Sequence, residues 1–394
     1  MRLLIIKLNA LGDLVIASPA FQRLRSGLPE AEIHLLTTDW SAPAMQGNPN
    51  VDETIVVPNA VFFRPGLRTV KPTLVLYRKL RRFKYDAAVL FHKHKAVIKF
   101  VDALGLTRRF HFSDLDDYAP NYDQFPISFV PLRRGLTAGD LLPFSARRNR
   151  NKIAQNSVVL DESRHSALTA WELADLAARE LGGRRVDEPA LEDLRYEWFC
   201  SEAEIEAARD ILHRWGLDEH PIIVLFPGGG RNPNLAEPAR RWPPPKWAQL
   251  SQRLMSKFGC RIVLLGSRDD AEACALANKF AAGRLFDLAG RYSIRQTAAL
   301  LKFARLAITN DSAPVHISAA VGIPTVGIYG PNGAQHKLPP GNCLGVSAGL
   351  PCSPCFFTIF KGCIFDRIHC MEDLTAEFVF EKIMPFIEAN SAGL

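Results

Sequence analysis

Residues 3–16 read LLIIKLNALGDLVI, an apolar run that passes through a glycine into the start of a helix. The run from Leu3 to Leu8 predicts a buried strand, and Gly12 allows a tight turn before the helix. Asp13 then lies at the carboxyl end of a strand, where open α/β sheets bind ligands. It is a candidate catalytic base, although an aspartate at this position can equally cap the helix through backbone N–H groups.

An alternation of short aliphatic runs and helical patterns extends along most of the 394 residues. It predicts an α/β fold with parallel sheets. A charged linker interrupts it near residue 195, so the sequence predicts two Rossmann-like domains, 1–195 and 196–375. A C-terminal helix over 376–394 is a candidate to pack back on the first domain. Between about 107 and 155 the alternation is lost, and we expect an insertion or a substrate-contacting loop there.

The formal net charge is +7, and basic residues crowd the first half of the chain. The runs comprise Arg64, Arg68, Lys71, Arg78, Lys79, Arg81, Arg82 and Lys84, then residues 92–95, Arg108 and Arg109, and finally Arg147, Arg148 and Arg150. Any one of these residues can simply be solvated surface, because charge runs usually face water. Together they favour an anionic acceptor or membrane surface, with Lys93 and Lys95 as candidate acceptor-binding residues.

The sequence as a whole disfavours several classes of protein. No stretch is long and apolar enough to cross a bilayer, and the N-terminus enters a strand without a signal pattern. We therefore expect a cytoplasmic location, at most peripheral on the inner membrane. Nucleic-acid binding is not expected, because the basic runs lack interleaved aromatic residues and a recognisable module.

The second half carries polar or glycine-rich segments where expected strands end. They are Pro227-Gly228-Gly229, Arg240-Arg241 ten residues later, Gly266 to Glu272, and Asn310-Asp311-Ser312 with His316. Glycines let backbone N–H groups approach a phosphate, and arginines can clamp a diphosphate. The spacing matches neither a dinucleotide-binding loop nor a P-loop, which disfavours NAD enzymes and P-loop NTPases.

Each of these segments also has a purely structural interpretation. The glycines can form a plain turn, the arginines can face solvent, and Asp269 and Asp270 can be helix-starting acids. Asp311 and Ser312 can cap a helix, and His316 can be a core histidine. The combination of acid, hydroxyl and imidazole at one strand end is harder to explain in this way.

Half of the eight cysteines form a cluster near the C-terminus. They are Cys352, Cys355, Cys363 and Cys370. In a cytosolic chain this spacing favours zinc or redox chemistry over disulfides, and a four-thiolate zinc site would be structural. Ordinary thiols remain an alternative, because free cysteines are often buried.

In their order along the chain, these motifs resemble glycosyltransferase family nine, the ADP-heptose:lipopolysaccharide heptosyltransferases. The matching segments are Leu11-Gly12-Asp13, Pro227-Gly228-Gly229, Arg240-Arg241-Trp242-Pro243, Leu265-Gly266, Asn310-Asp311-Ser312 with His316, and Gly330-Pro331. The resemblance implies the GT-B fold, with two Rossmann-like domains facing across a cleft. It also implies inverting transfer of a heptose from an ADP-sugar to an inner-core saccharide, Kdo or heptose, with no cofactor required for catalysis.

The resemblance also implies roles for individual residues. Asp13 would be the general base, Gly12 would let the acceptor approach, and Arg240, at a position where the family has lysine, would neutralise the leaving diphosphate. The donor would be held by Gly228, Gly229, Arg240, Arg241, Glu272, Tyr292, Asp311, Ser312 and His316. Two other interpretations stay open: a GT-B enzyme with another nucleotide sugar or acceptor, including an epimerase, and a catalytically silent nucleotide-sugar-binding protein.

Overall fold

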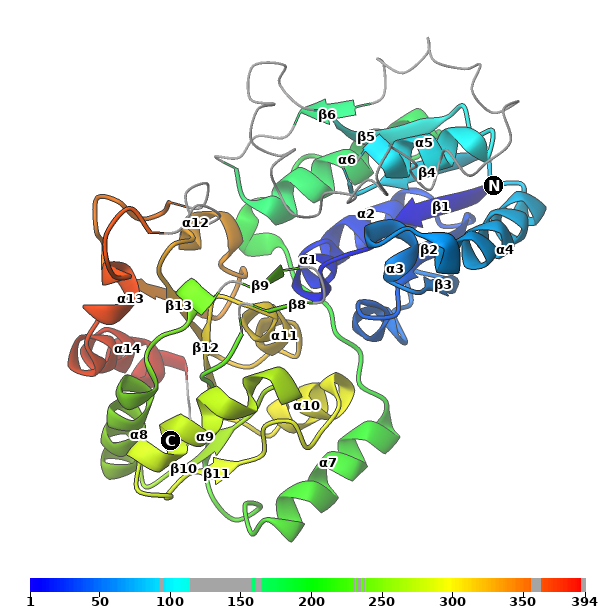
Figure 1. Ribbon diagram of the computed structural model, residues 1–394. Helices are drawn as coiled ribbons and strands as arrows, with labels where there is room; N and C mark the ends of the chain where they lie inside the picture. Colours follow the sequence, from blue (N-terminus) through cyan, green and yellow to red (C-terminus); the bar gives the residue numbers. More distant parts are fainter. Residues whose placement is uncertain are drawn as a thin grey trace. The chain divides into compact units, whose positions relative to one another are not determined.

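The computed structural model describes residues 1–92, 95–113, 157–159, 164–229, 231–232, 235–236, 238–355 and 363–390 (Figure 1). The chain divides into two compact units, Met1–Leu191 and Glu192–Leu394. Each unit is built on one six-stranded sheet. No helix in the described part of the chain is long and apolar enough to span a membrane.

The first unit contains a parallel sheet in the order β3-β2-β1-β4-β5-β6. Its strands are β1 (Arg2–Ile6), β2 (Glu32–Thr38), β3 (Glu53–Val57), β4 (Ala87–Leu90), β5 (Arg109–Ser113) and β6 (Ser157–Val159). Its helices are α1 (Leu11–Ile16), α2 (Ser18–Gly27), the short 3-10 helix η1 (Ala42–Met45), α3 (Ala60–Phe63), α4 (Leu67–Phe83), α5 (Lys95–Ala103) and α6 (Ser166–Glu180). The strand order reverses between β1 and β4, so the loop after β1 lies at a switch point, where such sheets bind ligands.

Strand β1 is central because its apolar run is buried on both faces, as expected for a parallel sheet. Leu3, Leu4, Ile5 and Ile6 are all 0% exposed.

Strand β5 corrects the expectation that the alternation of strands and helices ends at about residue 107. Its Phe110 is fully buried, and the strand pairs in parallel with β4. The alternating sequence RFHFS was short enough to be mistaken for loop; the rest of the expected insertion, 114–155, lies outside the described residues.

The second unit repeats this arrangement, with the parallel order β11-β10-β7-β12-β13-β14. Its strands are β7 (Ile222–Phe226), β10 (Arg261–Leu264), β11 (Phe286–Asp287), β12 (Leu306–Asn310), β13 (Thr325–Tyr329) and β14 (Cys343–Ser347), with a small hairpin β8 (Arg231–Asn232) and β9 (Leu235–Ala236). Its helices are α7 (Glu202–Arg214), α8 (Pro244–Phe258), α9 (Ala271–Phe280), α10 (Ile294–Leu301), α11 (Ala313–Ala320), α12 (Ala334–Lys337), α13 (His369–Glu372) and α14 (Ala376–Asn390), with 3-10 helices η4 (Leu191–Asp193), η5 (Pro238–Arg240) and η6 (Arg268–Asp270). Here the strand order reverses between β7 and β12.

The C-terminal helix α14 packs in the second unit, against α8. Val379, Ile383 and Ile387 lie four residues apart and are buried in the same core as Leu250 and Leu254 of α8. This spacing makes one apolar stripe along the helix, which is buried by packing against other elements. The described contacts of α14 thus lie within the second unit, and its packing on the first domain stays a prediction.

Candidate functional site

Asp13 lies in the first turn of α1, just after the central strand of the first sheet. Its carboxylate accepts a hydrogen bond from the backbone N–H of Ala10 at 3.3 Å, and the side chain stays partly exposed. Gly12 beside it is buried. The capping role considered for Asp13 is thus present in the structure, and it leaves a partly exposed carboxylate at the switch point.

Side chains from the neighbouring strands hold the loop that carries Asp13. The backbone N–H of Leu8 donates to His92 Nε2 at 2.6 Å, and the hydroxyl of Thr38 donates to the Leu8 carbonyl at 2.7 Å. His92 follows β4 and Thr38 ends β2, so both come from the carboxyl ends of strands that flank β1. Neither was predicted as a site residue, although both follow apolar strand runs.

Two lysines were predicted as acceptor contacts. Lys93 lies outside the described residues, and Lys95 begins α5 with a side chain that is also outside them.

In the second unit, the amide of Asn310 joins two strand ends. Asn310 ends β12, and its Nδ2 donates to the carbonyls of Pro227 and Gly228 at 2.9 and 2.8 Å. Its Oδ1 accepts from the backbone N–H of Trp242 at 3.0 Å. The glycine loop after β7 and the segment before α8 are therefore both attached to β12 by one fully buried side chain.

Asp270 and Arg241 fix the glycine loop in place. The N–H of Gly229 donates to Asp270 Oδ1 at 2.8 Å, and Arg241 Nε donates to the Gly229 carbonyl at 2.7 Å. Arg241 also lies 3.6 Å from Asp270. Asp270 is therefore more than a helix-starting acid, and it occupies the Gly229 N–H that was expected to meet a phosphate. Arg241 thus holds the loop, and its expected contact with a diphosphate stays a prediction.

The glycines in this loop are required by the space around them. Gly229 has φ of +96°, and a Cβ built on it would lie 2.5 Å from Ser312 Oγ. A Cβ on Gly228 would overlap the Asp270 carboxylate. Backbone conformations with positive φ are readily available only to glycine. The loop after β7 thus packs directly against both the Asp270 carboxylate and the Ser312 hydroxyl.

Arg240 and Asp311 form the second part of the cluster. Arg240 NH1 lies 3.3 Å from both the Asp311 carboxylate and the Asp311 carbonyl. Asn332, two residues after the Gly330 that follows β13, donates from Nδ2 to the same carboxylate. Asn332 is only 5% exposed and was not predicted; its signal was its place at the end of an expected strand. Burial, reinforced by the charge of Asp311, raises the pKa of the adjacent Tyr329 well above its ordinary value.

Ser312 and His316 belong to the first turns of α11. Ser312 is the N-cap residue, and its hydroxyl donates to the Asn310 carbonyl at 3.4 Å. His316 is 4% exposed, and its ring lies 6.0 Å from that of Tyr196. Ser312 is thus beside Asp311 and the glycine loop, whereas His316 is a largely buried ring one turn further along.

Tyr292 and Glu272 make no described hydrogen bond with this cluster. Tyr292 accepts from Trp215 Nε1 at 3.0 Å, while Glu272 is exposed on α9. The backbone N–H of Gly290 donates to the Gly266 carbonyl at 2.9 Å, which joins the loop before Tyr292 to the loop after β10. The donor-binding roles expected for Tyr292 and Glu272 remain predictions.

The four clustered cysteines do not form a metal-binding group in the described part of the chain. Within it, no three His, Cys, Asp or Glu side chains are placed to hold a metal ion together. Burial, and then the charges of Cys355, Cys352 and Cys363, raise the pKa of Cys370 to about 11. The cysteines thus influence one another, and zinc binding stays a prediction, with residues 356–362 between them outside the described residues.

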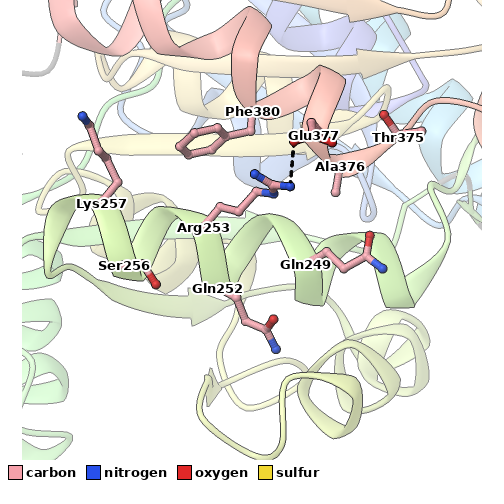
Figure 2. Close-up of a pocket in the computed structure, with 9 residues that line it drawn as sticks. All are labelled: Gln249, Gln252, Arg253, Ser256, Lys257, Thr375, Ala376, Glu377 and Phe380. Carbon is pink, nitrogen blue, oxygen red and sulfur yellow. Dashed lines mark hydrogen bonds and ion pairs between the residues drawn. The ribbon is translucent and has the colours of Figure 1, made fainter.

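A groove of about 740 Å³ lies elsewhere in the second unit, between α8 and α14 (Figure 2). It is lined by Gln249, Gln252, Arg253, Ser256, Lys257, Thr375, Ala376, Glu377 and Phe380. Across it, Arg253 and Glu377 form an ion pair of 3.0 Å. None of the predicted site residues lines this groove. The candidate site is therefore defined by the polar side chains at the strand ends, not by this groove.

Two parallel Rossmann-like sheets, each with polar residues at its switch point, define the GT-B class of glycosyltransferases. Residues 168–363 match glycosyltransferase family 9 (heptosyltransferase). The chain is 25% identical over 348 residues to lipopolysaccharide heptosyltransferase 2 of Salmonella typhimurium, covering 86% of this chain and 85% of that one. The chain belongs to glycosyltransferase family 9, the heptosyltransferases.

Solved structures share the fold. The structure of E. coli ADP-heptose lipopolysaccharide heptosyltransferase II is 21% identical, with a TM-score of 0.67 and complete coverage of both chains, 100% each. A family 9 glycosyltransferase from Veillonella parvula is 18% identical, with a TM-score of 0.73, and the match covers 98% of this chain and 97% of that one. These structures confirm the predicted fold class, and the match to the family model confirms the predicted family.

Proposed function

We propose that the protein transfers a heptose from ADP-heptose to an inner-core lipopolysaccharide saccharide, Kdo or heptose, with inversion and with Asp13 as the general base. Two of the relatives named above are heptosyltransferases, and one of them carries ADP-heptose in its name. The observation that carries the proposal is the group of Arg240, Asp311 and Asn332 at the switch point of the second sheet. In this group Arg240 is a cation that can bind a diphosphate, and Asp311 and Asn332 are polar side chains that can bind sugar hydroxyls.

The donor half of the reaction is assigned to the second unit. Arg240 neutralises the charge that develops on the leaving diphosphate, in a partly buried position where such charge–charge contacts are strong. Asp311 and the amide of Asn332 face the sugar hydroxyls. Asn332 Oδ1 is buried without a hydrogen-bond partner among the described residues, so a hydroxyl donor from a sugar would complete it.

The acceptor half is assigned to Asp13. The acceptor hydroxyl oxygen forms a bond to the anomeric carbon as the bond from that carbon to the diphosphate oxygen breaks. The hydroxyl proton passes to the Asp13 carboxylate, and ADP leaves with the electron pair of the broken bond. The hydrogen bond from the Ala10 N–H stabilises the ionised carboxylate before it takes the proton. The negative charge that develops on the leaving ADP is compensated by the Arg240 guanidinium, so the proposed route uses no metal ion.

The test combines donor binding with transfer. ADP-heptose should raise the melting temperature, because a ligand that binds only the folded state stabilises it. UDP- and GDP-sugars serve as controls and should give smaller shifts. Mass spectrometry should then detect one added heptose on a Kdo-terminated or heptose-terminated lipid A acceptor, together with released ADP. Donor binding without transfer to either acceptor would contradict the proposed acceptor, and no shift with ADP-heptose would contradict the donor.

A further inference from the structure

Helix α4 of the first unit has two faces of opposite character. Thr69, Thr73, Leu76, Tyr77 and Leu80 point into the protein, and the last three of them belong to the core that includes β1 and β4. The outer face is defined here as the α4 basic face. It consists of Leu67, Arg68, Lys71, Val75, Arg78 and Arg82, all exposed.

The charge on this helix has one sign. Arg68, Lys71, Arg78, Lys79, Arg81 and Arg82 are its charged residues, and the helix contains no acidic residue. Lys79 is paired with Glu53 at 2.8 Å. In the described part of the chain, no carboxylate lies within ion-pair distance of Arg68, Lys71, Arg78 or Arg82. The α4 basic face therefore presents uncompensated positive charge.

Two large apolar side chains lie on the same face. Leu67 is 89% exposed and Val75 is 57% exposed. Single exposed apolar residues are ordinary on protein surfaces. Here they occur within a basic, helical face, the pattern typical of helices that lie on a membrane surface with apolar side chains at the headgroup boundary.

The length of the face distinguishes an extended partner from a single anion. From Arg68 to Arg82 the helix rises about 21 Å at 1.5 Å per residue. Its C-terminal part lies at the edge where strands begin, since Lys79 pairs with Glu53 at the start of β3 and the Phe83 carbonyl accepts from Arg2 at the start of β1. The candidate site lies at the opposite edge. The α4 basic face is therefore longer than a single anionic group, and its C-terminal part lies away from the sheet edge that carries Asp13.

We propose that the α4 basic face docks the protein on an anionic lipid bilayer. Basic clusters of this size on an amphipathic helix are attracted to acidic headgroups, and the attraction falls with added salt. The α4 basic face would hold the first unit at the surface where a lipid-linked acceptor is embedded. That role rests on the proposed function, but lipid binding itself needs neither donor nor acceptor and is tested without them.

The full-length protein is to be sedimented with vesicles of phosphatidylcholine alone or with one-third phosphatidylglycerol, both free of lipopolysaccharide. We expect binding to the anionic vesicles, weakened by salt, and little binding to the neutral ones. R68Q/K71Q/R78Q should weaken partitioning about a hundredfold, since each basic residue near an anionic surface contributes about fivefold and three such contributions multiply. L67S/V75S should weaken it about tenfold through lost apolar contact.

A matched control removes the same charge elsewhere. K279Q/R284Q/K302Q alters three exposed basic residues of the second unit and should change partitioning by less than threefold. Far-ultraviolet circular dichroism and the melting temperature establish that all variants are folded. Equal losses from the two triple variants would overturn the proposal, as would binding to neutral and anionic vesicles alike. Stronger binding to a DNA duplex than to anionic vesicles, lost with the same α4 charges, would also overturn it in favour of a nucleic-acid surface.

Discussion

The two switch points of this chain occupy equivalent places in their sheets but hold their polar residues differently. At the second, Asn310 and Asp311 are buried and fixed to neighbouring loops by several side chains. At the first, Asp13 is partly exposed, and its carboxylate accepts a 3.3 Å hydrogen bond from the N–H of Ala10 as one of its contacts. The contrast is one of burial: the proposed donor side is a buried polar group, whereas the proposed base is partly exposed to solvent.

Asp13→Asn is the sharpest way to break this comparison. Asparagine keeps an oxygen that can accept from the Ala10 N–H but cannot take a proton. We expect kcat to fall about 10²- to 10⁴-fold, the usual contribution of a general base, with the donor-induced melting shift retained. The measurement is ADP release at saturating donor and acceptor.

Asp39→Asn is the matched control, because Asp39 is an exposed aspartate that directly follows β2 of the same sheet. Its carboxylate accepts from the N–H groups of Trp40 and Asn59, at 2.9 and 3.1 Å. Turnover of this variant should stay within about twofold, since an exposed substitution away from a reacting group costs little. Equal turnover of the Asp13 and Asp39 variants would remove Asp13 as the base.

Arg240 and Arg241 divide the second switch point into reacting and supporting parts. Arg240→Gln should lower kcat about 10²- to 10³-fold, because a charge that faces the leaving group is lost. Arg241→Gln should act mainly on stability, since its guanidinium binds the Gly229 carbonyl and the Asp270 carboxylate. Transfer rates and melting temperatures of the two variants check this, and the reverse pattern would contradict the assignment.

Asn332 is expected to be a positioning residue with a smaller effect. Asn332→Ala removes the amide that holds the Asp311 carboxylate, and donor affinity should fall about tenfold, equivalent to about one charge-assisted hydrogen bond. Asn332→Asp should be worse, because it places a second carboxylate beside the first. Calorimetric titration with ADP-heptose, alongside kcat, separates lost positioning from general instability. An Asn332→Asp variant that binds donor normally would refute the role.

The smallest effect tests whether stability in the second unit can be separated from its site. Arg295 hydrogen-bonds to Glu204 and lowers the pKa of that carboxyl to about 2, below its ordinary 4.5. Because the folded-state pKa is depressed, this stabilisation is complete above about pH 4.5 and is lost as pH falls toward 2. Glu204→Gln should lower the free energy of unfolding at pH 7 by about 1–2 kcal/mol after screening and flatten its pH dependence in that window.

Transfer activity provides the control for Glu204→Gln. The Glu204–Arg295 pair joins α7 to α10 and includes none of the proposed donor contacts. Its kcat at pH 7 should therefore match that of the unmodified protein at a temperature where both are folded. Urea unfolding between pH 3 and 7 gives the stability difference, and an unchanged slope with pH would argue against the ion pair as its source.

Much of the fold was predictable because long apolar runs determine it. Strands β1, β7 and β12 are mostly apolar segments followed by turn residues, and burial on both faces favours that composition. The position of α14 was not predictable, because its stripe of Val379, Ile383 and Ile387 indicates that it packs without indicating on what. Strand β5 was missed because only its Phe110 marks it clearly as core.

The candidate site was predicted as a set of residue types rather than as a set of contacts. Asn310, Asp311 and Arg240 were recognisable from their places after strands and from the family motifs. The pairing of Asp270 with the Gly229 N–H was not, since 41 residues separate the two and only the adjacency of β7 and β10 brings them together. Asn332 was missed for the same reason: its partner is Asp311, at the end of the adjacent strand β12.

The Asn310 amide limits which mutations this position tolerates. It must donate to two carbonyls and accept from one N–H group within a fully buried space. Aspartate would bring a negative charge against both carbonyls, and leucine would leave all three partners unsatisfied, while glutamine has the right groups on a side chain one methylene too long. Position 310 should therefore be among the least variable of the chain, even though its side chain is assigned no part in the chemistry.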